Sequence, residues 1–441
     1  MKIQQSEDED NLSSKLQDDG VNQSADNLSD EGQLEKSTLH YSWFVRTFGP
    51  MKKGSLRQSV IALMCAAMGS GMLSFPSNPV QSGLINCIIL MIICALLSRF
   101  SMYILMKCAF KYDQHSYAEL VKFALGPSMQ KFYSVDVICY TFGAIVCYQI
   151  LFTQFVWQVL LQFKVDESYK DEVRYIGGSI FMIINFPVSM MRDLYSLRYF
   201  THLQIIIIAY ILVTIIIFFF INAPEKFDSD KIVYFDFNIQ ITSTFAATFF
   251  GFICHQLIFP IRSELKRSTF KRMSKIFNRA IFSEAIIYLT LMIFGYLSFF
   301  ETTEKIIIDN YDTLAFTIAK ALFAFIMFFA VPINLNPSRL TVLQLIGKEK
   351  SWKAYVISTV ILQYTTGVIA MIYPNVKAIF GLLGGIFGMI MVIVLPCTLY
   401  ITLELKEGKK WSDSDILITL LIGVFSGIAG FTGAIVSQIY S

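Results

Sequence analysis

The chain has 441 residues, of which 55% are hydrophobic and only 16% are charged, and its formal net charge is +3. A soluble domain usually carries about 25% charged residues, so the composition excludes an ordinary soluble protein. The small net charge identifies no partner, and we expect no nucleic acid to bind. All eight cysteines fall in hydrophobic segments, which favours packing over a disulfide framework or a zinc site.

Residues 1–50 differ from the rest of the chain in being acidic and polar, as in SEDED and DNLSDEG. Such a segment cannot bury enough apolar surface to fold alone. We therefore expect a disordered, acidic, cytoplasmic tail, which could bind a regulatory partner. Residues 51–441 are expected to form a transmembrane domain in contact with membrane lipid.

The transmembrane domain repeats apolar stretches of roughly 20 residues, about the length that a helix needs to cross ~30 Å of hydrocarbon. Hydropathy, together with the glycine, proline and polar residues that separate the apolar stretches, predicts an all-α polytopic membrane protein with about eleven transmembrane helices. The fourth stretch is the shortest, and it contains Pro187. In chain order the expected spans are 56–76, 83–107, 132–160, 175–191, 201–222, 240–261, 279–300, 313–334, 354–373, 378–402 and 413–437.

Lysine and arginine in the loops predict the orientation of these spans. Cytoplasmic loops carry an excess of both residues. With the N-terminus inside, the inner loops hold about 20 of them, including seven between Arg262 and Arg279. The outer loops then hold Lys164, Lys170, Arg174, Lys226, Lys231, Lys305 and Lys377. We therefore predict a cytoplasmic N-terminus, and an odd number of spans puts the C-terminus outside.

Two of the predicted spans are interrupted by glycine and proline. The first contains MGSGMLSFP at 68–76, and the sixth contains GFICHQLIFP at 251–260. Glycine weakens a helix and proline cannot continue its hydrogen bonding, so both segments should expose backbone groups. Such glycines can also simply allow close helix packing. The matched places of the breaks, five spans apart, favour a 5+5 inverted repeat whose broken helices 1 and 6 form a substrate site, plus one extra C-terminal helix.

Several segments resemble the amino acid/auxin permease family. The first break is similar to its G-S-G-I-L-x-x-P motif, and FICHQLIFPIRSELK at 252–266 resembles the corresponding segment of its sodium-coupled neutral amino acid branch. Further similarity is found in SYAELVKFALG (116–126), GAIVCYQI (143–150), FPVSMMRDLYSLRYFT (186–201), VPINLNPSR (331–339) and GLLGGIFGMIMVIVLP (381–396). The resemblance implies a secondary active transporter that moves amino acids by alternating access.

The resemblance also implies which residues hold the substrate. The unwound parts of spans one and six correspond to the following residues: Gly69, Ser70, Gly71 and Met72, with Phe252, Cys254 and His255 opposite. Tyr148 matches the family's spacing in span three, although packing in the core would explain it equally well. Because His255 is the only ionisable side chain in the breaks other than the Cys254 thiol, we expect small or medium neutral amino acids as substrates.

The coupling ion is expected to be H⁺ or Na⁺, and no cofactor is expected. In the sodium-coupled branch an Asn in span one and a Thr in span eight are thought to ligate Na⁺. Cys65 and Ala330 occupy those positions here. A thiol is a poor ligand for a hard cation and alanine has no side-chain oxygen, so H⁺ coupling or facilitated transport is favoured. His255 could carry the proton or could order the broken helix by hydrogen bonding.

Four other charged residues lie within predicted spans. They are Arg99, Asp136, Glu284 and Lys320. A charge near the bilayer centre costs roughly 2.5–3.5 kcal/mol, so each should have a partner or face water. Asp136 and Glu284 could meet inner cations such as Arg99, whereas Arg99 and Lys320 could also extend to an interface. Structural or gating pairs are favoured over a coupling role, for which Asp136 remains a candidate.

The alternatives to transport are a sensor, an enzyme and an ion channel. A receptor-like amino acid sensor would bind substrate on the same fold with little or no flux. An enzyme finds no support, because the sequence has neither a metal-spaced His/Asp cluster nor a serine nucleophile motif nor a phosphate loop. An ion channel fits the matched breaks less well than alternating access does. The plasma membrane and a vacuolar or lysosomal membrane both remain open as the location.

Overall fold

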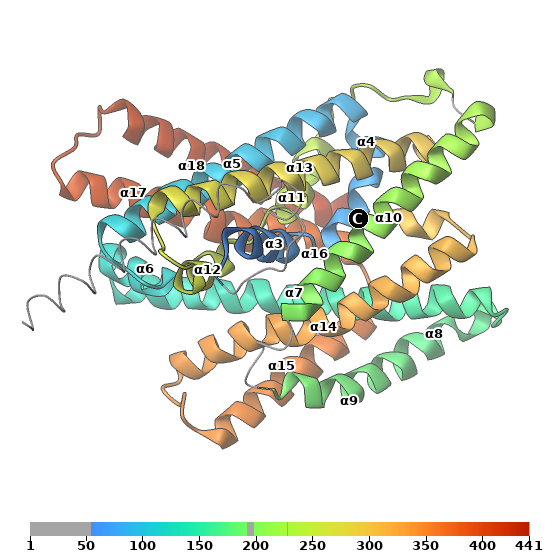
Figure 1. Cartoon of the computed structure of the whole chain (residues 1–441), viewed down its shortest axis with the longest axis horizontal. Coiled ribbons are helices and arrows are strands. Elements are labelled where there is room, and N and C mark those ends of the chain that lie inside the picture. Colours follow the sequence, from blue (N-terminus) through green and yellow to red (C-terminus); the bar gives the residue numbers. More distant parts are fainter. Residues whose placement is uncertain (1–53, 192–197, 227, 441) are drawn as a thin grey trace, which may run out of the picture. The chain divides into compact units, whose positions relative to one another are not determined.

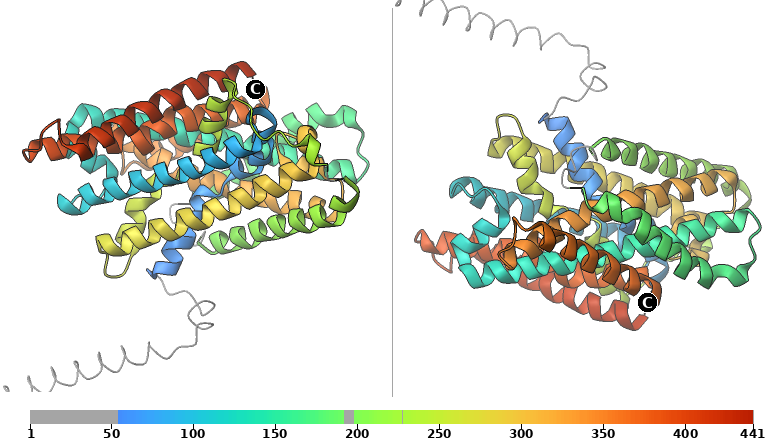
Figure 2. Two further views of the ribbon diagram at one scale, coloured as in Figure 1. Left: turned by 90° about the horizontal axis from the view of Figure 1, so that it is seen from above. Right: turned by 90° about the horizontal axis from the view of Figure 1, so that it is seen from below.

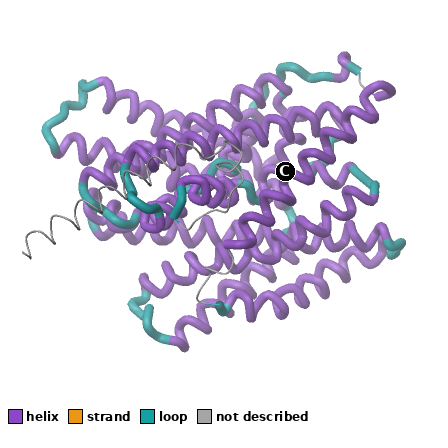
Figure 3. Tube along the Cα trace, viewed as in Figure 1, coloured by secondary structure: helices purple, strands orange, loops and turns teal. Residues whose placement is uncertain are grey.

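The computed structural model describes residues 54–191, 198–226 and 228–440, which are helical and contain no strand (Figure 3). The predicted tail, 1–50, lies outside these residues. The helices are α3 (Leu56–Ala67), α4 (Asn78–Ser82), α5 (Leu84–Lys111), α6 (Tyr117–Leu125), α7 (Pro127–Gln162), α8 (Lys170–Glu172), α9 (Gly178–Ser189), α10 (Arg198–Lys226), α11 (Gln240–Phe250), α12 (Ile258–Glu264), α13 (Phe270–Phe299), α14 (Leu314–Leu345), α15 (Trp352–Ile372), α16 (Val376–Leu382), α17 (Leu395–Lys406) and α18 (Ser414–Tyr440).

Shorter helical turns join several of these elements. 3₁₀ turns follow α3 at Ser70–Ser77, precede α12 at His255–Leu257 and occupy Ile307–Asn310 between α13 and α14. π-helical turns precede α9 at Val173–Gly177 and connect α16 to α17 at Leu383–Gly388 and Ile390–Val394. The tenth span is therefore continuous from Val376 to Lys406 but is not a regular α-helix along its whole length.

Nine helices in the described part of the chain are long and apolar enough to cross a membrane. The pair Leu56–Ala67 and Gly71–Ser82, bent by 59°, would make a tenth span. The predicted count of eleven is therefore not confirmed. The difference lies in the fourth expected span, where α9 has only 12 residues. At 1.5 Å per residue, α9 alone covers about 18 Å, well short of the hydrocarbon thickness.

The long helices run side by side in a bundle, and α3 lies at one side of it (Figures 1 and 2). α7 packs along α14, α11 packs along α18, and α13 contacts both α3 and α5. α11 has most of its side chains buried, whereas α18 and α10 expose many large apolar residues, including Phe425 and Ile221. This difference is typical of central helices enclosed by helices that face lipid.

Ion pairs tie three helices together at the end of the bundle that carries most of the lysines and arginines. The Glu404 carboxylate of α17 lies 3.2 Å from Lys111 of α5 and 2.7 Å from Lys409, which follows α17. Lys409 also pairs with Asp415 of α18, and Lys111 pairs with Glu407. We call this group, with Glu404 at its centre, the Glu404 cluster. It fixes α5, α17 and α18 relative to one another outside the region of the breaks.

Candidate functional site

The first break lies between α3 and the 3₁₀ turn that begins at Ser70. Gly69 leaves the helix with an extended backbone, φ −95° and ψ −150°. The Gln204 side chain of α10 reaches this point, and its amide Nε2 donates to the Cys65 carbonyl at 3.1 Å and to the Met68 carbonyl at 2.8 Å. Gln204 therefore satisfies backbone carbonyls that an unbroken helix would bond internally.

The second break follows α11. Residues 251–254 are not helical, and the chain resumes with the turn at His255–Leu257. The Tyr288 hydroxyl of α13 donates to the Gly251 carbonyl at 2.9 Å, and the Ser98 hydroxyl of α5 donates to the Phe252 carbonyl at 2.9 Å. Both breaks are thus held by neutral donors that other helices supply.

The two breaks adjoin each other through their glycines. A Cβ atom on Gly71 would lie 2.8 Å from Cδ1 of Phe250, which ends α11. A Cβ atom on Gly251 would overlap the ring of Phe75 in the first broken span. Each break therefore needs a glycine where an aromatic ring of the other broken span packs against it. Contact between residues about 180 positions apart indicates one shared site.

Tyr148 of α7 lies beside the first break. Its hydroxyl would be 3.3 Å from a Cβ atom built on Gly69, and it interacts with the Asn334 side chain of α14. Asn334 in turn donates to the Ala330 carbonyl at 3.0 Å. Gly69 and Tyr148, expected in one site, are thus neighbours, and α14 approaches the same point.

The remaining predicted residues are buried around the breaks. Met72, Phe252, Cys254 and His255 are at most 1% exposed. Phe252 packs edge-on against Tyr288, with 5.2 Å between ring centroids. The Ser70 side chain lies outside the described residues. Neither ring nitrogen of His255 has a hydrogen-bond partner among the described residues, so the expected ordering of the break by a histidine hydrogen bond is not observed.

The predicted membrane charges are not paired with one another in the described part of the chain. Arg99 Nε donates to the Asn278 side chain at 2.6 Å. Lys320 donates to the Tyr311 carbonyl at 3.0 Å and is within 3.4 Å of Gln158. The carboxylates of Asp136 and Glu284 are buried and have no hydrogen-bond partner among the described residues. Their expected pairing with Arg99 is not found.

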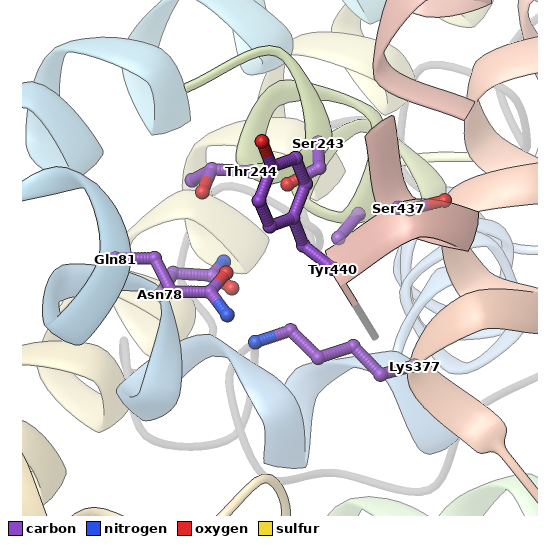
Figure 4. A pocket seen from close by; sticks show the side chains of 8 residues that line it. Asn78, Gln81, Ser243, Thr244, Lys377, Ser437 and Tyr440 are labelled. Atoms are coloured by element: carbon purple, nitrogen blue, oxygen red, sulfur yellow. The ribbon is translucent and has the colours of Figure 1, made fainter. Parts of the chain in front are cut away.

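Hydrogen bonds join α4, the second half of the first broken span, to α11, the first half of the second broken span. Asn78 of α4 donates to Thr248 of α11 at 3.3 Å, and the hydroxyls of Ser82 and Thr244 are 2.7 Å apart. A small pocket of about 10 Å³ lies beside these contacts, with Lys377 of α16 pointing toward Asn78 (Figure 4). That volume holds about one water molecule. The pocket is therefore too small for an amino acid.

A larger cavity, of about 500 Å³, lies at the end of α7 that is remote from the Glu404 cluster. It extends from Ile150 to Gln158 along α7. It also includes charged residues from the segment between α7 and α9, Lys170 and Arg174, and from the segment between α13 and α14, Glu304 and Asp309. Gln154 donates to the Asp309 carboxylate at 2.5 Å. Burial raises the pKa of the Asp309 carboxyl from about 3.8 to about 6. The cavity is large enough for a small molecule and begins only two residues beyond Tyr148.

Sequence reasoning missed the residues that hold the breaks, Gln204, Tyr288 and Ser98. Their sequence signal is a lone polar residue within an apolar stretch, and that signal does not say which break the residue serves. Among the described residues, no group of three or more His, Cys, Asp or Glu side chains could hold a metal ion.

Comparison with known proteins agrees with this geometry. The model of the transmembrane amino acid transporter protein family matches residues 52–436. The sodium-coupled neutral amino acid symporter 2 of Danio rerio is 26% identical over 391 residues, which cover 81% of this chain and 77% of that protein.

Two solved transporters show the fold. MhsT in complex with L-phenylalanine superimposes with a TM-score of 0.52 at 11% identity, covering 89% of this chain and 99% of that one. A Na⁺-coupled sialic acid symporter in a substrate-bound outward-open state gives a TM-score of 0.50 at 11% identity, with coverages of 87% and 90%. Because the family model spans most of the sequence, the chain belongs to the transmembrane amino acid transporter family and is a membrane transport protein rather than an enzyme.

Proposed function

We propose that this protein is a secondary active transporter that moves small or medium neutral amino acids by alternating access. The observation that supports this most directly is the contact between the two breaks, Gly71 against Phe250 and Gly251 against Phe75. Helix breaks free backbone N–H groups for a carboxylate and C=O groups for an ammonium group. An α-amino acid carries both groups on one carbon atom.

The side chains at the breaks favour a neutral substrate. Met72, Phe252 and Cys254 bring no charge, and His255 has no acidic partner among the described residues. A substrate with a charged side chain would leave that charge buried and unpaired, at a cost of several kcal/mol. A neutral side chain can instead pack against the apolar and aromatic residues of the two spans.

H⁺ is the coupling ion that we favour over Na⁺. A sodium site at the first break would need its backbone carbonyls, and two of them, those of Cys65 and Met68, accept hydrogen bonds from Gln204. In span eight Ala330 has no side-chain oxygen, and its carbonyl accepts from Asn334. The relative from Danio rerio is sodium-coupled by name, so the proposal separates this chain from it at that point.

Uptake of a labelled amino acid panel into proteoliposomes tests the proposal, with Na⁺ and pH gradients imposed separately. We expect neutral amino acids to accumulate when a pH gradient is imposed. We expect this accumulation to be unchanged when choline replaces Na⁺. Accumulation that requires Na⁺ and ignores pH would contradict H⁺ coupling. Binding of an amino acid with negligible flux would instead establish the receptor-like sensor.

The proposed orientation places the Glu404 cluster and the N-terminus in the cytoplasm. Loop charge supports it, since the described lysine- and arginine-rich loops lie at that end of the bundle (Figure 1). The plasma membrane and a vacuolar or lysosomal membrane are both compatible with it. Cysteine labelling of a tail position in intact and permeabilised cells or vesicles tests the orientation directly.

A further inference from the structure

Glu284 is a fully buried acid that the site described above does not use. It lies on α13, one turn before Tyr288, and its side chain is 0% exposed. Neither of its carboxylate oxygens has a hydrogen-bond partner among the described residues. Tyr288, on the next turn of the same helix face, donates to the Gly251 carbonyl of the second break. Glu284 therefore lies close to the second break.

The ionisable groups that face Glu284 come from both broken spans. Cys65 at the end of α3 and Cys254 in the second break interact with it electrostatically, as does Tyr288. All three are neutral acids at physiological pH. From α5, which packs against α13, the cation Arg99 donates a hydrogen bond to Asn278 at an exposed position. α10 contributes a neutral amide, Gln204, to the same region.

A buried carboxylate in such surroundings is unstable as an anion. Removing an ionised carboxyl group from water without a partner costs several kcal/mol, whereas the neutral acid loses much less. The proton can leave without that cost only when the breaks rearrange and water or a cation reaches the group. Proton binding at this position is thus linked to the conformation of both broken spans.

We infer that Glu284 is the proton-binding residue of the transport cycle. This inference rests on the proposed H⁺ coupling. Glu284 takes a proton from the solution on one side of the membrane, carries it as the neutral acid while it is buried, as in the structure described here, and releases it on the other side. The carboxyl group is regenerated as the carboxylate, so no other reactant is consumed.

The other two buried ionisable candidates fit this role less well. His255 is uncharged in its unprotonated form. Burying it therefore places no charge away from water, and no change of conformation is needed to relieve one. Asp136 interacts with Tyr117 of α6 and with Tyr133 of α7, and among the described residues it has no direct contact with either break. Among the described residues, Glu284 is a carboxylic acid in electrostatic contact with both Cys65 of the first broken span and Cys254 of the second.

The test compares Glu284→Gln with Glu119→Gln, which removes an exposed acid from α6. A gradient of one pH unit can drive about ten-fold accumulation in one-to-one symport. We expect wild type and Glu119→Gln to accumulate substrate by up to about that factor. Glu284→Gln should only equilibrate it, with no substrate-evoked signal from a pH-sensitive dye, while exchange of labelled for unlabelled substrate at equal pH continues.

Accumulation by Glu284→Gln that still follows the pH gradient would overturn the inference and leave the proposed H⁺ coupling intact. A wild-type protein that ignores the pH gradient would refute the coupling itself, and the inference with it. Should Glu284→Gln fail to fold, Glu284→Asp decides the question, because it keeps the acid but moves it by one methylene group. We expect its pH profile of uptake to shift, and a profile identical to wild type would overturn the inference.

Discussion

Replacing Gln204 by leucine tests how the first break is held. The substitution keeps the approximate size of the side chain but removes the amide that bonds the Cys65 and Met68 carbonyls at 3.1 and 2.8 Å. A buried carbonyl left without a partner costs about 1–3 kcal/mol. For two carbonyls this is about 2–6 kcal/mol, of which the easier burial of leucine returns about 1–2 kcal/mol. We therefore expect a net loss of about 1–4 kcal/mol.

Thermal unfolding of the purified protein in detergent measures this loss. At about 2 °C per kcal/mol for a chain of this size, the melting temperature should fall by about 2–8 °C. Gln204→Glu provides a sharper contrast, because an anionic oxygen would then face the same two carbonyl oxygens. Its stability should depend on added Na⁺, which can bridge the three oxygens, whereas wild type should not respond. Unchanged melting of Gln204→Leu, or a wild type stabilised by Na⁺ as strongly as Gln204→Glu, would refute the reasoning.

Three further outcomes follow from the described contacts. Gly251→Ala puts a methyl group into the Phe75 ring, so it should lower the stability by about 1–3 kcal/mol and abolish most of the uptake. Gly427→Ala is the control: its methyl group has ordinary packing space, so this variant should melt and transport like wild type. Asp309 has a folded-state pKa of about 6, above its ordinary 3.8, so the folded protein binds the extra proton. Stability should therefore fall as pH rises from about 4 to about 6, and Asp309→Asn should remove that slope in melting curves measured across this range. Glu404→Gln leaves three lysines without their shared carboxylate and should lower the melting temperature at low salt. The difference in melting temperature from wild type should be smaller at about 1 M salt, because salt screens ion pairs. A difference that salt does not change would contradict an ionic origin.

Local signals in the sequence were sufficient to locate the two breaks. Gly69, Gly71 and Pro76 interrupt the first span within nine residues, and the structure bends there by 59°. Gly251 and Pro260 bracket the second interruption, and α11 ends at Phe250. Glycine and proline act on their own backbone, so their effect can be read without knowledge of the fold.

The groups that hold the breaks could not be predicted in the same way. Gln204 is 139 positions from Cys65, and Tyr288 is 37 positions from Gly251. Which carbonyl each donor reaches depends on how α10 and α13 pack, and hydropathy does not encode that packing. The fourth span shows the same limit, because length and Pro187 indicated an irregular stretch without fixing where α9 would begin.

The bonds that hold the breaks also bear on how the protein can change state. Gln204 supplies two hydrogen bonds, and Tyr288 and Ser98 supply one each. Each neutral hydrogen bond contributes about 0.5–1.5 kcal/mol, so releasing all four costs about 2–6 kcal/mol. Binding a substrate with micromolar affinity provides about 8 kcal/mol. The substrate can therefore replace these donors within its own binding energy, while the ion pairs of the Glu404 cluster keep α5, α17 and α18 fixed. An unbroken pair of helices would have to lose a whole ladder of backbone bonds to expose the same groups, and this is why we propose that transport takes place at the breaks.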